Sequence, residues 1–200
     1  MKPVVFRSTA AFVFAWAWLA FVAINLVDIA LRGDDAAAVI ATGALLLGAG
    51  VAYVVGLRPR VVADDEGVRL HNPLRDIRLP WHKVDKVEAT HAIEVHSDDQ
   101  VYRAWALQTS PRARLRAEAK ARRGADLDSS VPDKIAEHLK GKMPTDFAAD
   151  QLNQLAEQKR GGLAESTTAA ASVSLWWPAV IALALPAVLL AVSIVVAVLA

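Results

Sequence analysis

Histidine is the residue in this 200-residue sequence best suited to metal binding or general base catalysis, because imidazole titrates near neutral pH and ligates zinc. The five histidines are His71, His82, His91, His96 and His138. A zinc site brings three or four ligands to one point. If residues 91–96 form a strand, His91 and His96 point to opposite faces and cannot easily share an ion. We therefore expect no metal site.

Other patterns of catalytic or ligand-binding residues are weak. The chain has no cysteine, which excludes thiolate ligands, disulfides and cysteine nucleophiles. It also lacks the zincin, P-loop, dinucleotide-binding and nucleophile-elbow motifs. Asp64-Asp65-Glu66 and Ser97-Asp98-Asp99 could bind calcium, but they lack the spaced oxygen ligands of a known loop and are predicted to be solvated turns. We expect no enzymatic activity and no cofactor.

The strongest charged feature is a predicted helix over residues 111–123, with six basic residues against Glu118. One interpretation is a solvated face that helps to fix topology. The other is attraction to anionic lipid headgroups, at about 1 kcal/mol per Lys or Arg near the surface. The candidate lipid- or partner-binding residues are Arg58, Arg60, Arg75, Arg78 and Lys83, as a positive rim, with Arg112, Arg114, Arg116, Lys120, Arg122 and Arg123 on the helix. A net charge of only +1 and the absence of evident stacking aromatics argue against nucleic-acid binding.

These residues lie between long apolar runs. Thr9–Leu31, Ala36–Leu57 and Leu175–Ala200 contain 23, 22 and 26 residues. Because roughly 20 apolar residues of helix cross a bilayer, we predict three transmembrane helices. The first run could be a signal peptide, but its apolar core exceeds the ~7–15 residues of a signal, which favours a retained anchor.

The flanking charges predict an orientation. Lys2 and Arg7 precede the first run, and Arg58 and Arg60 follow the second, whereas residues 32–35 between the two runs are net acidic. The positive-inside rule then places the N-terminus and residues 58–174 in the cytoplasm and the C-terminus outside, in a multi-pass protein of the cell (inner) membrane.

Two features within the runs could have a role. The small residues Ala44, Gly48, Ala52 and Gly56 recur every four positions, as in helix-packing interfaces, and could face a neighbouring span or a second copy. Asp28 is an intramembrane acid, which marks either a functional site or an ion pair with Arg32 one turn later.

Residues 58–110 alternate between apolar and polar positions, and turn residues separate the alternating segments, a pattern typical of antiparallel strands. The predicted strands cover 60–63, 68–71, 75–79, 84–88, 92–96 and 100–108. We expect a small sandwich or barrel that buries Trp81 or Trp105. Two helices are predicted farther on, over 130–140 and 145–160, the second with an apolar stripe of Ala148, Leu152 and Leu155, and a linker over 163–174.

Four motifs in this segment carry a resemblance. They are Arg58-Pro59-Arg60-Val61-Val62, Asp65-Glu66-Gly67-Val68, Asn72-Pro73-Leu74-Arg75 and Leu79-Pro80-Trp81. Over residues 55–110 the chain resembles the bacterial pleckstrin-homology (PH) domain family, in the branch named after an actinobacterial low-molecular-weight protein antigen. The resemblance implies a PH-like β-fold on a membrane anchor, and it implies no catalytic residues.

The sequence thus predicts an α+β membrane protein with three transmembrane helices, a small PH-like antiparallel β-domain and following helices. We expect a hairpin over 1–57, the PH-like domain with its basic helix over 58–123, a helical extension and linker over 124–174, and the third span over 175–200. The expected function is a non-catalytic module at the cytoplasmic face that binds a protein partner or anionic lipid headgroups. The alternative is an accessory subunit of a transport or envelope-synthesis complex, assembled through its transmembrane helices.

Overall fold

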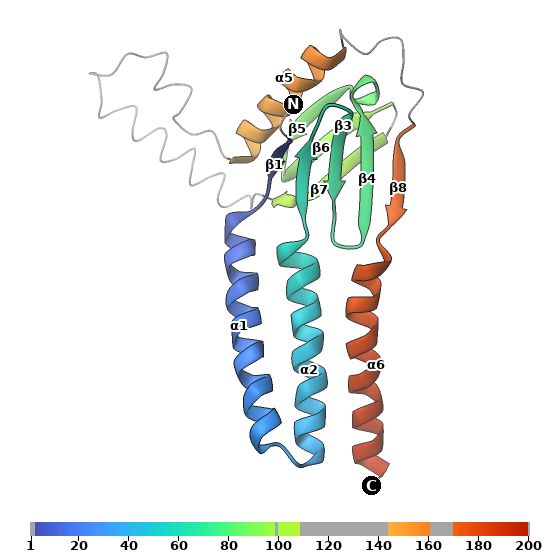
Figure 1. Cartoon of the computed structure of the whole chain (residues 1–200). Coiled ribbons are helices and arrows are strands. Elements are labelled where there is room, and N and C mark those ends of the chain that lie inside the picture. The colour runs from blue at the N-terminus through green and yellow to red at the C-terminus, as the bar shows by residue number, and fades with distance from the viewer. Residues whose placement is uncertain (1–2, 99, 109–143, 161–169, 200) are drawn as a thin grey trace, which may run out of the picture. The chain divides into compact units, whose positions relative to one another are not determined.

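The computed structural model describes residues 3–98, 100–108, 144–160 and 170–199, and the chain folds into two compact units (Figure 1). The β-unit comprises Met1–Phe6, Arg60–Leu70 and Ile77–Ser172. The helical unit comprises Arg7–Pro59, His71–Asp76 and Val173–Ala200. The expected α+β class is confirmed.

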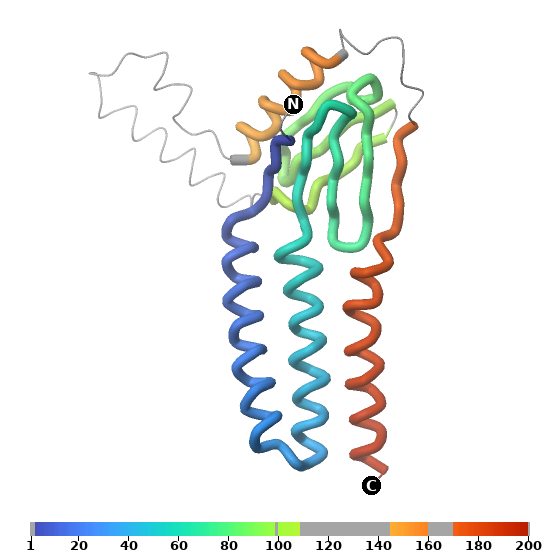
Figure 2. The backbone as a smooth tube through the Cα atoms, in the orientation of Figure 1, coloured from blue at the N-terminus to red at the C-terminus, as the bar shows by residue number. Residues whose placement is uncertain are grey.

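Three long helices make up most of the helical unit. They are α1 (Thr9–Arg32), α2 (Ala36–Ala52) and α6 (Trp177–Leu199). Figure 2 shows them side by side, and α2 packs against both of the others. Ser8 caps α1 and Asp35 caps α2, because each side chain accepts a hydrogen bond from a backbone N–H of the first turn.

The helices match the three predicted spans. Thr9–Arg32, Ala36–Leu57 and Trp177–Leu199 are long and apolar enough to cross a membrane, and most of their large apolar side chains are exposed within the chain. Apolar side chains that point outward from a helix are stable when lipid surrounds them. Asp28 forms an ion pair with Arg32 at 3.3 Å, which agrees with the ion-pair alternative for this intramembrane acid.

Glycines allow α2 to approach both neighbours. A Cβ on Gly48 would lie 3.0 Å from the Trp18 ring, and one on Gly56 would lie 2.6 Å from the Cβ of Ala15, both on α1. A Cβ on Gly50 would lie 2.3 Å from the carbonyl oxygen of Ala182 on α6. Gly48 and Gly56 of the small-residue ridge therefore serve packing within the chain.

The strands form two antiparallel sheets. The five-stranded sheet has the order β1-β2-β3-β4-β8, with β1 Val4–Phe6, β2 Arg60–Ala63, β3 Gly67–His71, β4 Arg75–Pro80 and β8 Ser172–Leu175. The three-stranded sheet has the order β5-β6-β7, with β5 Lys86–Ala89, β6 Ala92–Ser97 and β7 Gln100–Gln108. All six predicted strands are present. Strands β1 and β8 were not predicted, because each is short and directly precedes a span.

Turn chemistry sets the β2–β3 connection. The Asp64 carboxylate accepts hydrogen bonds from the backbone N–H groups of Glu66 and Gly67, at 2.9 and 3.1 Å. Such local bonds from Asp favour a turn over a continued strand. Gly67 is required here, because a Cβ at this position would lie 2.2 Å from the carbonyl oxygen of Leu79.

The core of the β-unit lies on the inward faces of the strands. Its largest fully buried side chains include Trp81, Leu70, Leu79 and Ile93. Trp81 is 1% exposed and its indole N–H donates to the Asp64 carbonyl at 2.8 Å, whereas Trp105 is 47% exposed. Of the two tryptophans proposed for the core, Trp81 is therefore the buried one.

Helix α5 (Pro144–Arg160) completes this core. Ala148, Ala149, Leu152 and Ala156 are buried among the strand residues, and the Asn153 amide both donates to and accepts from the backbone of Val87 at 2.8 Å. This helix was predicted within an extension after residue 123, and in the structure its apolar stripe packs against the strands. The predicted helix over 130–140 lies outside the described residues.

Candidate functional site

The side chain of Arg58 is the most buried charged group described in the helical unit. After α2 the chain widens into a π-helical turn, Tyr53–Leu57, and the Arg58 N–H donates to the Tyr53 carbonyl at 3.0 Å. The Arg58 side chain is only 6% exposed. Burial of a guanidinium is costly unless other groups compensate its charge.

Two groups compensate Arg58. Its Nη2 donates to Asp76 Oδ1 at 2.6 Å, and the guanidinium lies over the Trp176 ring, 4.3 Å from the centroid. A cation over an aromatic face is attracted by the negative face of the ring. The Trp176 N–H in turn donates to the Leu74 carbonyl at 2.9 Å, which fixes the tryptophan against the β3–β4 turn.

His71 adds an imidazole to the same carboxylate, with Nδ1 at 2.8 Å from Asp76 Oδ1. We call Arg58, His71, Asp76 and Trp176 the Arg58 junction. Arg58 Nη1 is buried and has no hydrogen-bond partner among the described residues. All four residues belong to the helical unit, so the junction ties the β3–β4 turn to the start of α6 and holds a positive charge at the end of the second candidate span.

The structure places the predicted positive rim in three different environments. Arg58 is buried in the junction, and its burial follows from its partners Asp76 and Trp176. Arg78 pairs with Glu66, and Lys83 pairs with Asp98 at 2.9 Å. Arg60 and Arg75 are exposed and make no ion pair in the described part of the chain.

The remaining basic candidates, Arg112, Arg114, Arg116, Lys120, Arg122 and Arg123, lie outside the described residues. Their predicted helix and its role therefore remain predictions. Arg60 and Arg75 are the two candidate cations for which the structure shows exposure without a paired acid.

The acidic turns considered for calcium make other contacts. Lys159 of α5 bonds to Asp65 at 2.5 Å, and this bond is the largest cause of a pKa of the Asp65 carboxyl lowered to about 2. Asp98 is the partner of Lys83. Each turn thus has a structural role through a lysine.

One group of chemistry-bearing side chains was missed. The ligand atoms of Glu88, Glu94 and His96 all lie within 4.8 Å of one another. His91 and His96 were expected not to share an ion because they belong to one strand region, whereas this group joins two strands, β5 and β6. Strand alternation puts Glu94 and His96 on one face, which is the signal that the sequence carries, whereas Glu88 joins them only through the β5–β6 register.

The comparisons with known proteins agree with the fold. The family model described as the bacterial PH domain matches residues 58–126. Over these residues the chain has a PH-like domain. No curated protein and no solved structure matches the chain. The matched residues include β2 to β7, whereas β1, α5 and β8 of the same sheets and core lie outside the match.

Proposed function

We propose that the chain is a non-catalytic, membrane-anchored interaction module whose PH-like domain lies at the cytoplasmic face. The observation that carries the proposal is the position of the PH-like domain, which lies in the sequence between the second and third candidate spans. The motifs Asn72-Pro73-Leu74-Arg75 and Leu79-Pro80-Trp81 support the branch named after the actinobacterial low-molecular-weight protein antigen.

The cytoplasmic placement rests on the basic residues Arg7, Arg58 and Arg60 beside the spans. It can be tested with single cysteines, since the chain has none of its own. A membrane-impermeant maleimide added to intact cells should label Asp34→Cys in the short loop between α1 and α2. It should label Gln100→Cys, on exposed β7, only after lysis. Labelling of Gln100→Cys in intact cells would reverse the placement.

The proposed ligand is a protein partner or the headgroups of anionic lipids. Exposed Arg60 and Arg75 support the lipid form, because each unpaired cation near an anionic surface contributes about 1 kcal/mol of attraction. The domain is already tethered, so this attraction would orient it rather than recruit it.

Hydrogen exchange on the full chain in nanodiscs tests the lipid form. Nanodiscs with anionic phosphatidylglycerol should slow amide exchange around Arg60 and Arg75 relative to neutral phosphatidylcholine, and salt should remove the difference. The double variant Arg60→Gln/Arg75→Gln should lose the difference, whereas Arg69→Gln, whose arginine already pairs with Asp64, should keep it. Equal exchange in both lipids would exclude headgroup binding and leave a protein partner.

The accessory-subunit alternative depends on the small-residue ridge and on the third span. Gly48 and Gly56 of that ridge lie against α1 of the same chain. Packing within the chain accounts for these two glycines, and the interaction-module function is the better supported of the two.

A further inference from the structure

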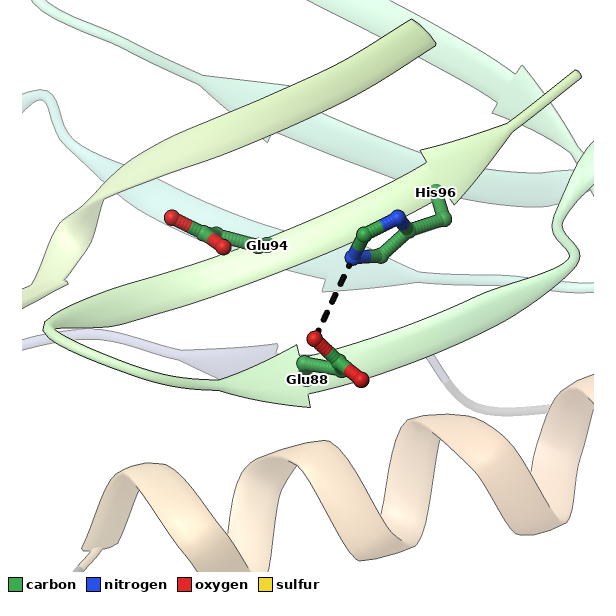
Figure 3. A group of neighbouring side chains, drawn as sticks. All are labelled: Glu88, Glu94 and His96. Carbon is green, nitrogen blue, oxygen red and sulfur yellow. Dashed lines mark ion pairs between the residues drawn. The ribbon is translucent and has the colours of Figure 1, made fainter. Parts of the chain in front are cut away.

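We propose that Glu88, Glu94 and His96 form a binding site for a divalent transition-metal ion of the zinc class. The three side chains project from β5 and β6 (Figure 3). The proposal is independent of the function proposed above.

The strand register places the three side chains on one face. Glu88 lies directly opposite Glu94 across the β5–β6 ladder, and His96 follows Glu94 by two residues. Their neighbours Val87, Ile93 and Val95 are buried in the core. Because successive strand residues alternate between faces, the two glutamates and the histidine share the outer face.

The distances suit a single ion. His96 Nε2 lies 3.4 Å from Glu88 Oε2, and all three ligand atoms lie within 4.8 Å of one another. Two ligands bound at about 2.1 Å to a tetrahedral ion are about 3.4 Å apart. Small rotations of the Glu94 side chain would therefore complete a three-ligand set.

His96 also presents a nitrogen that the protein leaves unsatisfied. The Nε2 atom is buried and has no hydrogen-bond partner among the described residues. The Glu88 carboxylate forms an ion pair with it, but the distance of 3.4 Å is too long for a strong hydrogen bond. A buried polar atom without a partner requires an explanation, and a bound ion is one of the usual ones. An ion between the three side chains would satisfy the nitrogen.

Two basic side chains form ion pairs with the glutamates. Lys86 Nζ contacts Glu88 Oε1 at 2.5 Å, and Arg103 Nε contacts Glu94 Oε1 at 2.7 Å. Both cations are largely exposed, so their pairs with the glutamates are weak. They compete with an ion for the carboxylates, and removing one of them should therefore tighten metal binding.

The ligand types select the metal. One imidazole and two carboxylates suit Zn²⁺ better than Ca²⁺ or Mg²⁺, which prefer oxygen ligands alone. Three protein ligands leave one coordination position for water.

The test uses the full chain in detergent, stripped with a chelator and titrated with Zn²⁺ by calorimetry, with Co²⁺ absorption as a probe of tetrahedral geometry. We expect saturable binding of one ion that His96→Gln and Glu94→Gln each weaken by at least about tenfold. His82→Gln and His91→Gln change exposed histidines and should leave the affinity unchanged.

The variant Lys86→Gln separates this proposal from a simple surface ion-pair ladder. We expect it to bind Zn²⁺ roughly threefold more tightly than the wild type, because a competing cation is gone. Melting curves in chelator verify that every variant is folded, and Lys86→Gln remains decisive if a ligand variant does not fold. Absence of saturable binding, equal loss in His96→Gln and His82→Gln, or weaker binding by Lys86→Gln would overturn the proposal.

Discussion

Arg58 Nη2 and Asp76 Oδ1 are joined by a hydrogen bond of 2.6 Å, in which a nearly fully buried guanidinium meets a carboxylate that is 28% exposed. The bond links the end of the second candidate span to the first strand residues after the β3–β4 turn, and Trp176 covers the guanidinium on one face. Arg58 therefore bears most of the desolvation cost of the pair. Loss of the Asp76 carboxylate would leave the buried Arg58 charge unpaired.

Asp76→Asn should destabilise the chain by about 2–4 kcal/mol, because the buried Arg58 charge loses its counter-charge. Arg58→Met should cost less, since Asp76 keeps His71 and partial solvation. The double variant should cost less than the sum of the two single variants. Thermal melts of the full chain in detergent measure all three, and additive losses would show that the two residues do not act as a pair.

Asn153→Ala should weaken the attachment of α5 to β5. The Asn153 amide makes two hydrogen bonds with Val87, and their loss should cost about 1–3 kcal/mol and speed hydrogen exchange at the Val87 amide. Gln154→Ala, at the adjacent exposed position, is the matched control and should leave both quantities unchanged. Unchanged exchange at Val87 in Asn153→Ala would contradict the contact.

The Asp65–Lys159 pair predicts a pH dependence. Its folded pKa of about 2 lies below the ordinary 3.8, so the pair contributes stability that is complete above about pH 4. That contribution is lost as the pH falls from about 4 through about 2, because the unfolded chain binds the proton first. NMR titration of the Asp65 carboxyl should show the low pKa, Lys159→Gln should return it toward 3.8, and Lys83→Gln should not change it.

The two tryptophans of the PH-like domain should respond differently to the same change. Trp81→Phe removes a buried ring edge and the hydrogen bond to the Asp64 carbonyl, and should cost about 1–3 kcal/mol. Trp105→Phe, at a half-exposed position, should change stability by about 0.5 kcal/mol or less. Thermal melts of the two variants provide the comparison, and equal losses would contradict the assignment of Trp81 to the core.

The predicted elements were those whose signal is local. The length of the apolar runs was sufficient to predict the three spans. Alternation of apolar and polar residues between turns was sufficient to predict six strands. In Arg75–Pro80, for example, Ile77 and Leu79 are buried and Arg78 is exposed. Strand β1 has only three residues, and β8 is rich in serine, so neither carries a pattern strong enough to predict a strand.

The parts that could not be predicted depend on partners distant in sequence. In the sequence, Arg58 is one of the basic residues that flank a span. Its burial in the structure depends on Asp76 and Trp176, which are distant in the sequence. The apolar stripe of α5 was predicted, and so were strands β5 to β7, but the sequence did not show that the stripe packs on these strands. Glu88 joins Glu94 and His96 only through the β5–β6 register, which the sequence alone left undetermined.

The outer strands of the five-stranded sheet have a consequence for biosynthesis and for experiments on fragments. The strand at one edge comes from residues 4–6 and the strand at the other from residues 172–175. The ribosome must therefore translate past residue 175 before this sheet can close. A recombinant fragment limited to the matched residues 58–126 would lack both edge strands, β1 and β8. The unpaired backbone groups of β2 and β4 would then be exposed and would promote self-association.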